Sequence, residues 1–192
     1  MVAVSLSRAI ACWLRTACLL LCLVALGNAR AQGERVVAEV QVKAAYLYKF
    51  LDFVEWPPRA FDTVESPFVI GVVGADALAD ELTQVVAKRQ AGGRPVVARK
   101  LQPGEPMTGV HMLFIGRGAA ARTAGLVAST KDAPVLTVTE TEDAFAAGSS
   151  INFVLVDNKV RFDVALRGGE ASHFKISSRL LGVARKVVGA SS

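Results

Sequence analysis

The chain has 192 residues, a formal net charge of +5 at pH 7 and a hydrophobic share of 52%. Three of its 22 basic residues and none of its 17 acidic residues fall within residues 1–31, so the rest of the chain carries a net charge of +2. That balance gives little support to nucleic-acid binding, which needs a clustered basic face.

Residues 1–31 have the features of a secretory signal peptide. Arg8 and Arg15 precede an apolar run at residues 17–26, which is too short to span a bilayer, and small residues follow it up to Ala31. We expect cleavage after Ala31 and export to the periplasm, with no stable membrane insertion of the mature chain. An uncleaved N-terminal anchor is the alternative, because Arg30 interrupts the pattern of small residues at the cleavage site.

All three cysteines, Cys12, Cys18 and Cys22, fall within this leader. Cys22 lies inside the apolar run, which argues against a lipid-anchored protein. The predicted mature chain therefore has no thiol, which excludes a disulfide, a cysteine nucleophile, a cysteine-ligated zinc and an iron–sulfur cluster. We expect residues 32–192 to form one domain, since a chain of that length can bury a sufficient core without cross-links.

The mature chain alternates between helical and strand patterns. Helices are predicted at residues 36–54, 76–88, 116–130, 142–147 and 170–188, the second of them capped by Asp76. Strands are predicted at residues 68–73, 94–101, 111–115, 135–139, 150–156 and 159–164. The dipeptide Asp157-Asn158 suits a tight hairpin between the last two strands. The sequence thus predicts a single-domain α/β fold: a mixed, mostly parallel sheet with helices on both faces and a C-terminal β-hairpin plus helix, the hairpin forming an antiparallel edge.

The stretch YLYKFLDFVEWPP, residues 46–58, is rich in large apolar side chains. A helix turns only part of its circumference toward its own core, so these side chains cannot all face the same way. We expect most of them to pack in the core, with Trp56 closing the end of the helix. The apolar side chains of this stretch that do not pack in the core predict a contact with a second copy or with a partner protein. Tyr48 and Trp56 are the candidate contact residues.

A second candidate contact surface lies in the C-terminal part of the chain, where Arg161, Lys175 and Arg179 add positive charge. The alternative is a solvated helix face. For Arg185 and Lys186 we favour this alternative, because cations near the C-terminus of a helix also interact well with its dipole.

Residues 116–121, GRGAAA, read as the glycine pattern G-x-G-x-x-A between an apolar strand and a predicted helix. Glu140 ends the next strand, where an acid that binds a ribose would lie. A nucleotide or small-ligand site at this loop would use Gly116, Arg117, Gly118, Arg122 and Glu140. The interpretation that we favour is a turn of small residues that lets a helix pack close to the sheet.

The sequence holds no catalytic constellation. His111 opens an apolar strand and is expected to be structural, and neither His111 nor His173 has a second ligand at a metal-binding spacing. Ser149 and Ser150 lack the strand–turn–helix setting of a nucleophile elbow. We therefore expect no catalytic residue, no metal and no cofactor, and a protein that is not an enzyme.

Several short segments, spread over most of the mature chain, match the pattern of a known family in the same order. They are residues 42–46 (VKAAY), Phe50, 55–57 (EWP), 70–74 (IGVVG), 93–95 (GRP), 111–115 (HMLFI), 136–138 (LTV), Gly148, 151–153 (INF), 160–162 (VRF) and 175–181 (KISSRLL). With these segments in this order, the chain resembles the YfiR-like family of periplasmic signalling regulators.

The resemblance implies a periplasmic α/β protein, commonly a dimer, that binds and restrains an inner-membrane signalling enzyme. In the best-known arrangement that enzyme is a diguanylate cyclase with a periplasmic sensor domain, so the expected partner is a GGDEF-type cyclase or a histidine kinase. Family members often have cysteines at the positions of Gly71 and Val110, where a disulfide can join two strands. This chain has neither cysteine, which removes that route to redox control.

Overall fold

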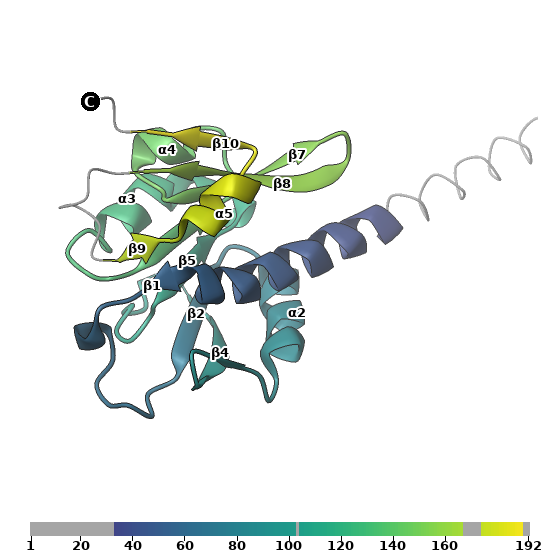
Figure 1. Ribbon diagram of the computed structural model, residues 1–192. Helices are drawn as coiled ribbons and strands as arrows, with labels where there is room; N and C mark the ends of the chain where they lie inside the picture. Colours follow the sequence, from purple (N-terminus) through teal and green to yellow (C-terminus); the bar gives the residue numbers. More distant parts are fainter. Residues whose placement is uncertain (1–32, 103, 167–173, 190–192) are drawn as a thin grey trace, which may run out of the picture. The chain divides into compact units, whose positions relative to one another are not determined.

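The computed structural model describes residues 33–102, 104–166 and 174–189 (Figure 1). The chain divides into two compact units, residues 1–39 and 40–192. Residues 33–50 are helical, and residues 40–50 of this N-terminal helix belong to the second unit, which also contains the sheet. The predicted signal peptide and His173 lie outside the described residues.

The remaining elements follow the alternation that the sequence predicts. Their order is η1 (Leu51–Phe53), β1 (Val54–Glu55), η2 (Pro58–Ala60), β2 (Phe68–Val73), α2 (Asp76–Val86), β3 (Gln90–Ala91), β4 (Arg94–Lys100), β5 (Met112–Ile115), η3 (Arg117–Arg122), α3 (Thr123–Ala128), β6 (Leu136–Thr139), α4 (Ala144–Ala147), β7 (Ile151–Val156), β8 (Lys159–Ala165), β9 (Lys175–Ile176), α5 (Ser178–Val183) and β10 (Lys186–Val188), where η denotes a 3-10 helix.

The main sheet has the strand order β10-β8-β7-β6-β5-β2-β4-β3 in the described residues. Neighbouring strands run parallel except for the pairs β7–β8 and β3–β4. Strands β1 and β9 form a separate antiparallel pair. The mixed, mostly parallel α/β sheet predicted from the sequence is confirmed.

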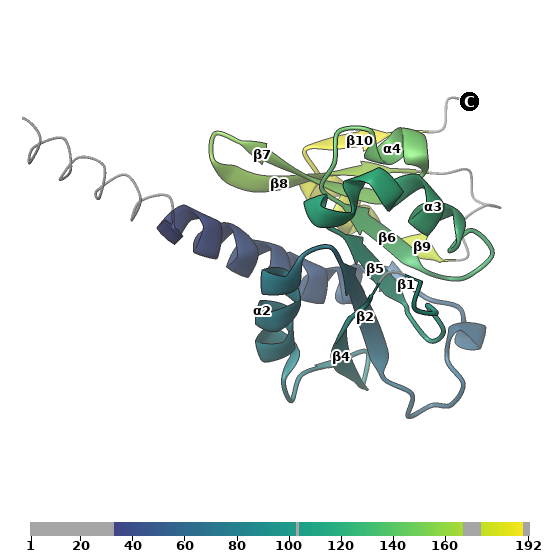
Figure 2. The ribbon, with the colours of Figure 1, turned by 180° about the vertical axis from the view of Figure 1, so that it is seen from behind.

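The central strands are continuous apolar runs because both of their faces are covered. Along β5, the side chains of Met112 and Phe114 join one buried cluster and those of Leu113 and Ile115 join another, as the alternation of a strand requires. The first cluster includes residues of the N-terminal helix, α2 and α5; the second includes residues of η3 and α3. Figure 2 shows α3 in front of the sheet, on the side turned away in Figure 1.

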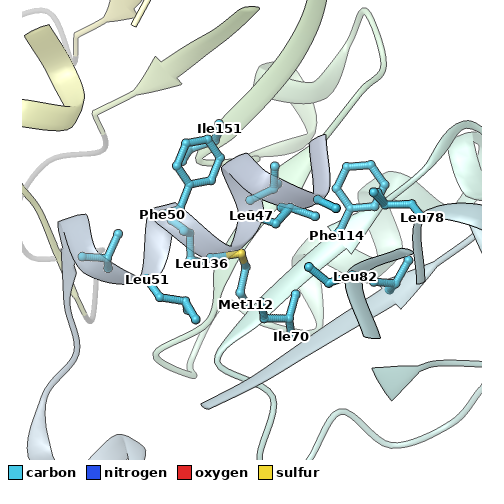
Figure 3. Packing of buried hydrophobic residues seen from close by; sticks show 14 of the residues in the cluster. Leu47, Phe50, Leu51, Ile70, Leu78, Leu82, Met112, Phe114, Leu136 and Ile151 are labelled. Carbon is cyan, nitrogen blue, oxygen red and sulfur yellow. The ribbon is translucent and has the colours of Figure 1, made fainter. Parts of the chain in front are cut away.

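The N-terminal helix fills the first cluster. Leu47 and Phe50 are 0% and 1% exposed, and Figure 3 shows them with Leu51 over side chains of the central strands. Phe50 stacks on Phe153, with ring centroids 5.8 Å apart, and meets the edge of Phe162 at 5.0 Å. This packing places the end of the helix, and Trp56 after it, at a fixed point beside the sheet.

The turn between β7 and β8 has the predicted form. Asp157 and Asn158 have φ values of 50° and 58°, the left-handed conformation that a tight hairpin needs at both central residues. The hairpin is not an edge of the sheet, however, because β10 adds outside β8 in parallel.

The helix predicted at residues 170–188 is wrong in its extent. The described part holds β9, the six-residue α5 and β10. Pairing with the sheet overrides the helical spacing, since the amide of Arg185 donates to the carbonyl oxygen of Phe162 at 2.8 Å and that of Leu166 to Val188 at 2.8 Å. Two consecutive valines at the end of the segment suit a strand.

Asp76 does not cap α2. The N-cap residue is Ala75, with no side-chain cap. The carboxylate of Asp76 instead lies 2.6 Å from Nζ of Lys100 at the end of β4, so it links the helix to the strand that follows it.

The packing of the N-terminal helix predicts the outcome of two matched leucine truncations. Leu47→Ala removes a side chain that is 0% exposed, and we expect it to lower the free energy of unfolding by about 2–5 kcal/mol. Leu155→Ala removes one that is 47% exposed, and we expect less than about 1 kcal/mol. Urea unfolding followed by circular dichroism measures both, and equal losses would contradict the assignment of the core.

Candidate functional site

Trp56 is half-buried and is held by hydrogen bonds. Its indole Nε1 donates to the carbonyl oxygen of Pro134 at 3.0 Å and more weakly to that of His111 at 3.3 Å. Its ring meets Phe68 edge to face at 5.1 Å and lies 6.5 Å from Phe174. The indole therefore ties the chain after the N-terminal helix to the loops that precede β5 and β6, and part of it stays exposed.

The strand pair β1–β9 brings two distant parts of the chain together beside Trp56. Glu55 lies opposite Lys175 in this pair, and the amide of Ser177 donates to the carbonyl oxygen of Phe53 at 2.9 Å. Lys175 and Arg179 are exposed. We call Trp56, Phe174, Lys175 and Arg179 the β1–β9 surface.

Tyr48 lies elsewhere on the N-terminal helix. Its hydroxyl donates to the carbonyl oxygen of Gln90 at 2.9 Å, and the cationic groups of Arg89 and Lys49 lie 5.2 Å and 5.5 Å from its ring centroid. Tyr48 is half-buried and lies against the start of β3.

The side chain of Arg161 lies on the face of the main sheet opposite to the first cluster. Its neighbours Val160 and Phe162 belong to the first cluster, and side chains alternate along a strand. Since Leu180 of α5 also belongs to the first cluster, Arg161 lies on the opposite face from α5. The structure thus places Lys175 in β9 and Arg179 in α5, in the same part of the chain that pairs with the strand before Trp56, and it leaves Tyr48 and Arg161 apart from them.

Arg185 is exposed, and its guanidinium also pairs with a buried carboxylate. Its Nε lies 2.8 Å from Oδ1 of Asp163, and its Nη2 bonds the other carboxylate oxygen. Asp163 is buried, and this hydrogen bond, with the charge of the carboxylate, raises the pKa of Arg185. The pair joins β8 to the start of β10, whereas Lys186 is exposed on β10 itself.

The backbone amides of the glycine loop bond to the protein. Gly116 donates to Val73 at 2.8 Å, Gly118 to Gly74 at 3.1 Å and Ala119 to Gly116 at 2.9 Å. The amide of Arg117 donates to Oε1 of Glu140 at 3.0 Å. A phosphate cradle needs amides that point at the ligand, so this geometry favours the packing interpretation of the loop.

Close backbone contact explains the glycines. A Cβ atom at Gly118 would lie 2.8 Å from the carbonyl oxygen of Gly74, and one at Gly116 would lie 2.6 Å from the same atom. Gly74 itself has a φ of 69°, which favours glycine. The loop after β5 therefore rests directly on the loop after β2.

Glu140 is occupied by a partner that the sequence analysis missed. Nζ of Lys43 on the N-terminal helix forms an ion pair with Oε2 of Glu140, and both side chains are less than a tenth exposed. The guanidinium of Arg117 approaches the same oxygen at 4.0 Å, while Arg122 is exposed at the end of η3. No local spacing indicates a pair that is 97 residues apart.

His111 is a structural residue with both ring nitrogens bonded. Nε2 donates to the carbonyl oxygen of Ala60 at 2.8 Å, and Nδ1 accepts the amide of Val69 at 3.2 Å. The ring stacks on Phe61 with centroids 4.4 Å apart. Burial lowers the pKa of His111, and the charge of Arg94 adds to that effect.

The other polar residues weighed as catalysts are also bonded within the fold. The hydroxyl of Ser149 donates to the carbonyl oxygen of Ile151 at 2.9 Å and accepts from Thr139 at 3.0 Å. The hydroxyl of Ser150 lies 3.4 Å from that of Thr137. Within residues 33–102, 104–166 and 174–189, no group of three histidine, cysteine, aspartate or glutamate residues is placed to hold a metal ion.

The chain belongs to the YfiR/HmsC-like family, whose model matches residues 40–185. Members of this family are known as periplasmic regulators of cyclic-di-GMP signalling rather than as enzymes. No curated protein matches the chain. Across the described part of the chain, none of the helices combines the length and apolar character needed to cross a bilayer.

Gly71 and Val110, the two positions where the family resemblance implies cysteines, lie side by side. A Cβ atom at Gly71 would come within 3.3 Å of Cγ1 of Val110. In this chain Leu101 fills that space, with its Cδ1 only 2.6 Å from the same Cβ position. Apolar packing therefore joins β2 to the residues just before β5 at this point.

The burial of His111 predicts a pH-dependent loss of stability. Because its pKa is lower in the folded chain than in the unfolded chain, protonation of the unfolded state below about pH 6.5 favours unfolding. We expect the free energy of unfolding to fall between pH 7 and pH 5 more steeply than in His111→Gln, by at most about 1.4 kcal/mol per pH unit. Parallel curves from urea titrations of the two proteins would contradict this account.

The glycine loop predicts that Gly118→Ala destabilises the fold without any ligand. The added methyl group would meet the backbone of Gly74, and we expect a loss of about 1–3 kcal/mol. In Gly125→Ala, the matched control, the methyl group meets nothing within 4 Å, and the gain in helix propensity should raise stability by up to about 1 kcal/mol. Thermal unfolding measures both.

Saturable stabilisation by ATP or GTP that Gly118→Ala abolishes would instead support the nucleotide site.

Proposed function

We propose that this protein is exported to the periplasm, where it binds and represses an inner-membrane signalling enzyme, a GGDEF-type diguanylate cyclase. The observation that carries the proposal is the family match over residues 40–185. A histidine kinase is the alternative partner.

The proposal includes an N-terminal leader. Residues 1–31 would direct export and be removed, and residues 32–192 would form the regulatory domain. The family match begins at residue 40, so it leaves the proposed leader outside the matched region. The mass of the mature protein, measured after export of the full chain, tests the cleavage site.

We place the main partner contact on the β1–β9 surface. Its support is the combination of a half-buried aromatic pair, Trp56 and Phe174, with two exposed cations, Lys175 and Arg179. Aromatic residues and arginine are favoured at the centres of interfaces, and charges at the rim steer association. Tyr48 and Arg161 then belong to separate surfaces, and we propose that one of these serves a homodimer.

The first cluster supports a rigid contact surface. Trp56 is held at its indole nitrogen, and Ile176 and Leu181 pack against the first cluster. A surface fixed in this way binds with little loss of conformational entropy. A matching acidic and apolar patch is therefore expected on the periplasmic domain of the cyclase.

The proposed contact at the β1–β9 surface predicts that reversing one of its charges lowers the affinity for the cyclase. In Arg179→Glu, the reversed charge should repel an acidic partner surface, and we expect binding of the cyclase's periplasmic domain to weaken about tenfold, with a flatter salt dependence. Lys131→Glu, at an exposed lysine outside the β1–β9 surface, is the matched control and should bind like the unmodified protein. Calorimetric titration measures both. Equal affinity of the two variants would remove the β1–β9 surface from the proposal.

A further inference from the structure

A cavity of about 360 Å³ lies on the face of the main sheet that carries the second cluster. Its walls are the loop after β4 and one side of α3. Val73, Leu101, Met107 and Leu126 line it with apolar side chains. Neither the β1–β9 surface nor residues 116–121 of the glycine loop contribute to it. The volume falls in the range of cavities that bind small organic ligands.

The wall that the loop provides is held in place by Arg99. This arginine donates from Nη2 to the carbonyl oxygen of Pro106 at 2.9 Å and from Nη1 to that of Thr108 at 3.3 Å. The carboxylate of Glu105 accepts the amide of Gln102 at 2.9 Å, which closes a turn in the same loop. These hydrogen bonds tie the described residues of the loop to β4 and to one another.

The other wall has free space at Gly125. A Cβ atom built on this glycine meets nothing within 4 Å, although the residue lies in the middle of α3 and lines the cavity. A glycine inside a helix costs about 1 kcal/mol relative to alanine. Neither a close backbone contact nor a positive φ requires glycine at this position. The missing side chain leaves open space beside Leu126.

The polar groups at the cavity favour a ligand that donates hydrogen bonds. Glu105 is the one charged side chain among the described residues that line it, and Ser129 and Gln102 are neutral. The hydroxyl of Ser129 already donates to the carbonyl oxygen of Leu126 at 2.7 Å, so it offers a ligand its acceptor lone pairs. A carboxylate beside apolar walls attracts a cation and repels an anion.

We propose that this cavity is a binding site for a small apolar primary amine. The apolar part of the ligand would lie against Leu101, Met107 and Leu126, and its ammonium group would face the carboxylate of Glu105. Such a site would give the regulator a small-molecule input that is separate from its protein contact.

The test uses phenethylamine as the probe and protein purified after expression of the full chain. Amide NMR spectra should show saturable shifts at Gln102, Met107 and Leu126 at millimolar probe concentrations. Phenethyl alcohol, which has no charge, should bind more weakly, and phenylacetate should bind least. Glu105→Gln should weaken phenethylamine several-fold, up to about fivefold, as expected for an exposed ion pair, without weakening phenethyl alcohol.

Gly125→Leu places a large apolar side chain at the cavity wall, at a position where a Cβ atom meets nothing within 4 Å. It should keep or raise the melting temperature, because leucine is the better helix former, and it should weaken phenethylamine at least about tenfold. Gly182→Leu, at a helical glycine of α5 with equally open surroundings, is the matched control and should bind like the unmodified protein. Binding that survives Gly125→Leu, binding of phenylacetate as tight as that of the amine, or no saturable shift would each overturn the proposal.

Discussion

The packing of residues 40–50 of the N-terminal helix against one face of the sheet is the contact on which the rest of the structure depends. Leu47 and Phe50 bury almost their whole side chains there, and the rings of Tyr46, Phe50, Phe153 and Phe162 interlock. This face has no disulfide to hold it among the described residues, so apolar burial supplies the stabilisation. Because the helix ends at a fixed place, Trp56 reaches the carbonyl oxygens of His111 and Pro134. For the same reason β1 lies where it can pair with β9.

The same helix also changes what the carboxyl edge of the parallel strands can do. In many α/β proteins that edge holds a ligand, but here Lys43 pairs with Glu140, and the amides of residues 116–119 bond to the protein itself. The buried charges are neutralised within the fold, and the glycines serve close packing. This geometry supports a protein that acts through its surface, with the β1–β9 surface as the proposed place of contact.

The sequence predicted those parts of the fold that follow from local patterns. Continuous apolar runs identified β2, β5 and β6, and Asp157-Asn158 identified the hairpin, because burial on both faces and positive φ values leave a direct mark on residue choice. Strands of two or three residues, such as β1, β9 and β10, leave no such mark, since they exist through pairing with distant segments. For the same reason the spacing at residues 170–188 predicted a helix where the sheet captures the backbone.

The candidate site was predictable in its residue types but not in its grouping. Aromatic density identified Trp56, and positive charge identified Lys175 and Arg179, yet their proximity depends on the β1–β9 pairing. Arg161 carries the same charge and lies on the opposite face of the sheet, because one residue along a strand reverses the direction of a side chain. The cavity beside α3 escaped the sequence analysis altogether, since its walls come from residues 73, 101–102, 104–107, 125–126 and 129, which share no motif.

The central claim, that the protein restrains a signalling enzyme from outside the inner membrane, is tested most directly by cellular cyclic-di-GMP. The gene would be deleted and replaced by the full chain or by residues 32–192 without the leader. The account predicts that deletion raises cyclic-di-GMP, that the full chain restores the low level, and that the leaderless chain, retained in the cytoplasm, does not. An unchanged level after deletion, or full restoration by the leaderless chain, would contradict it.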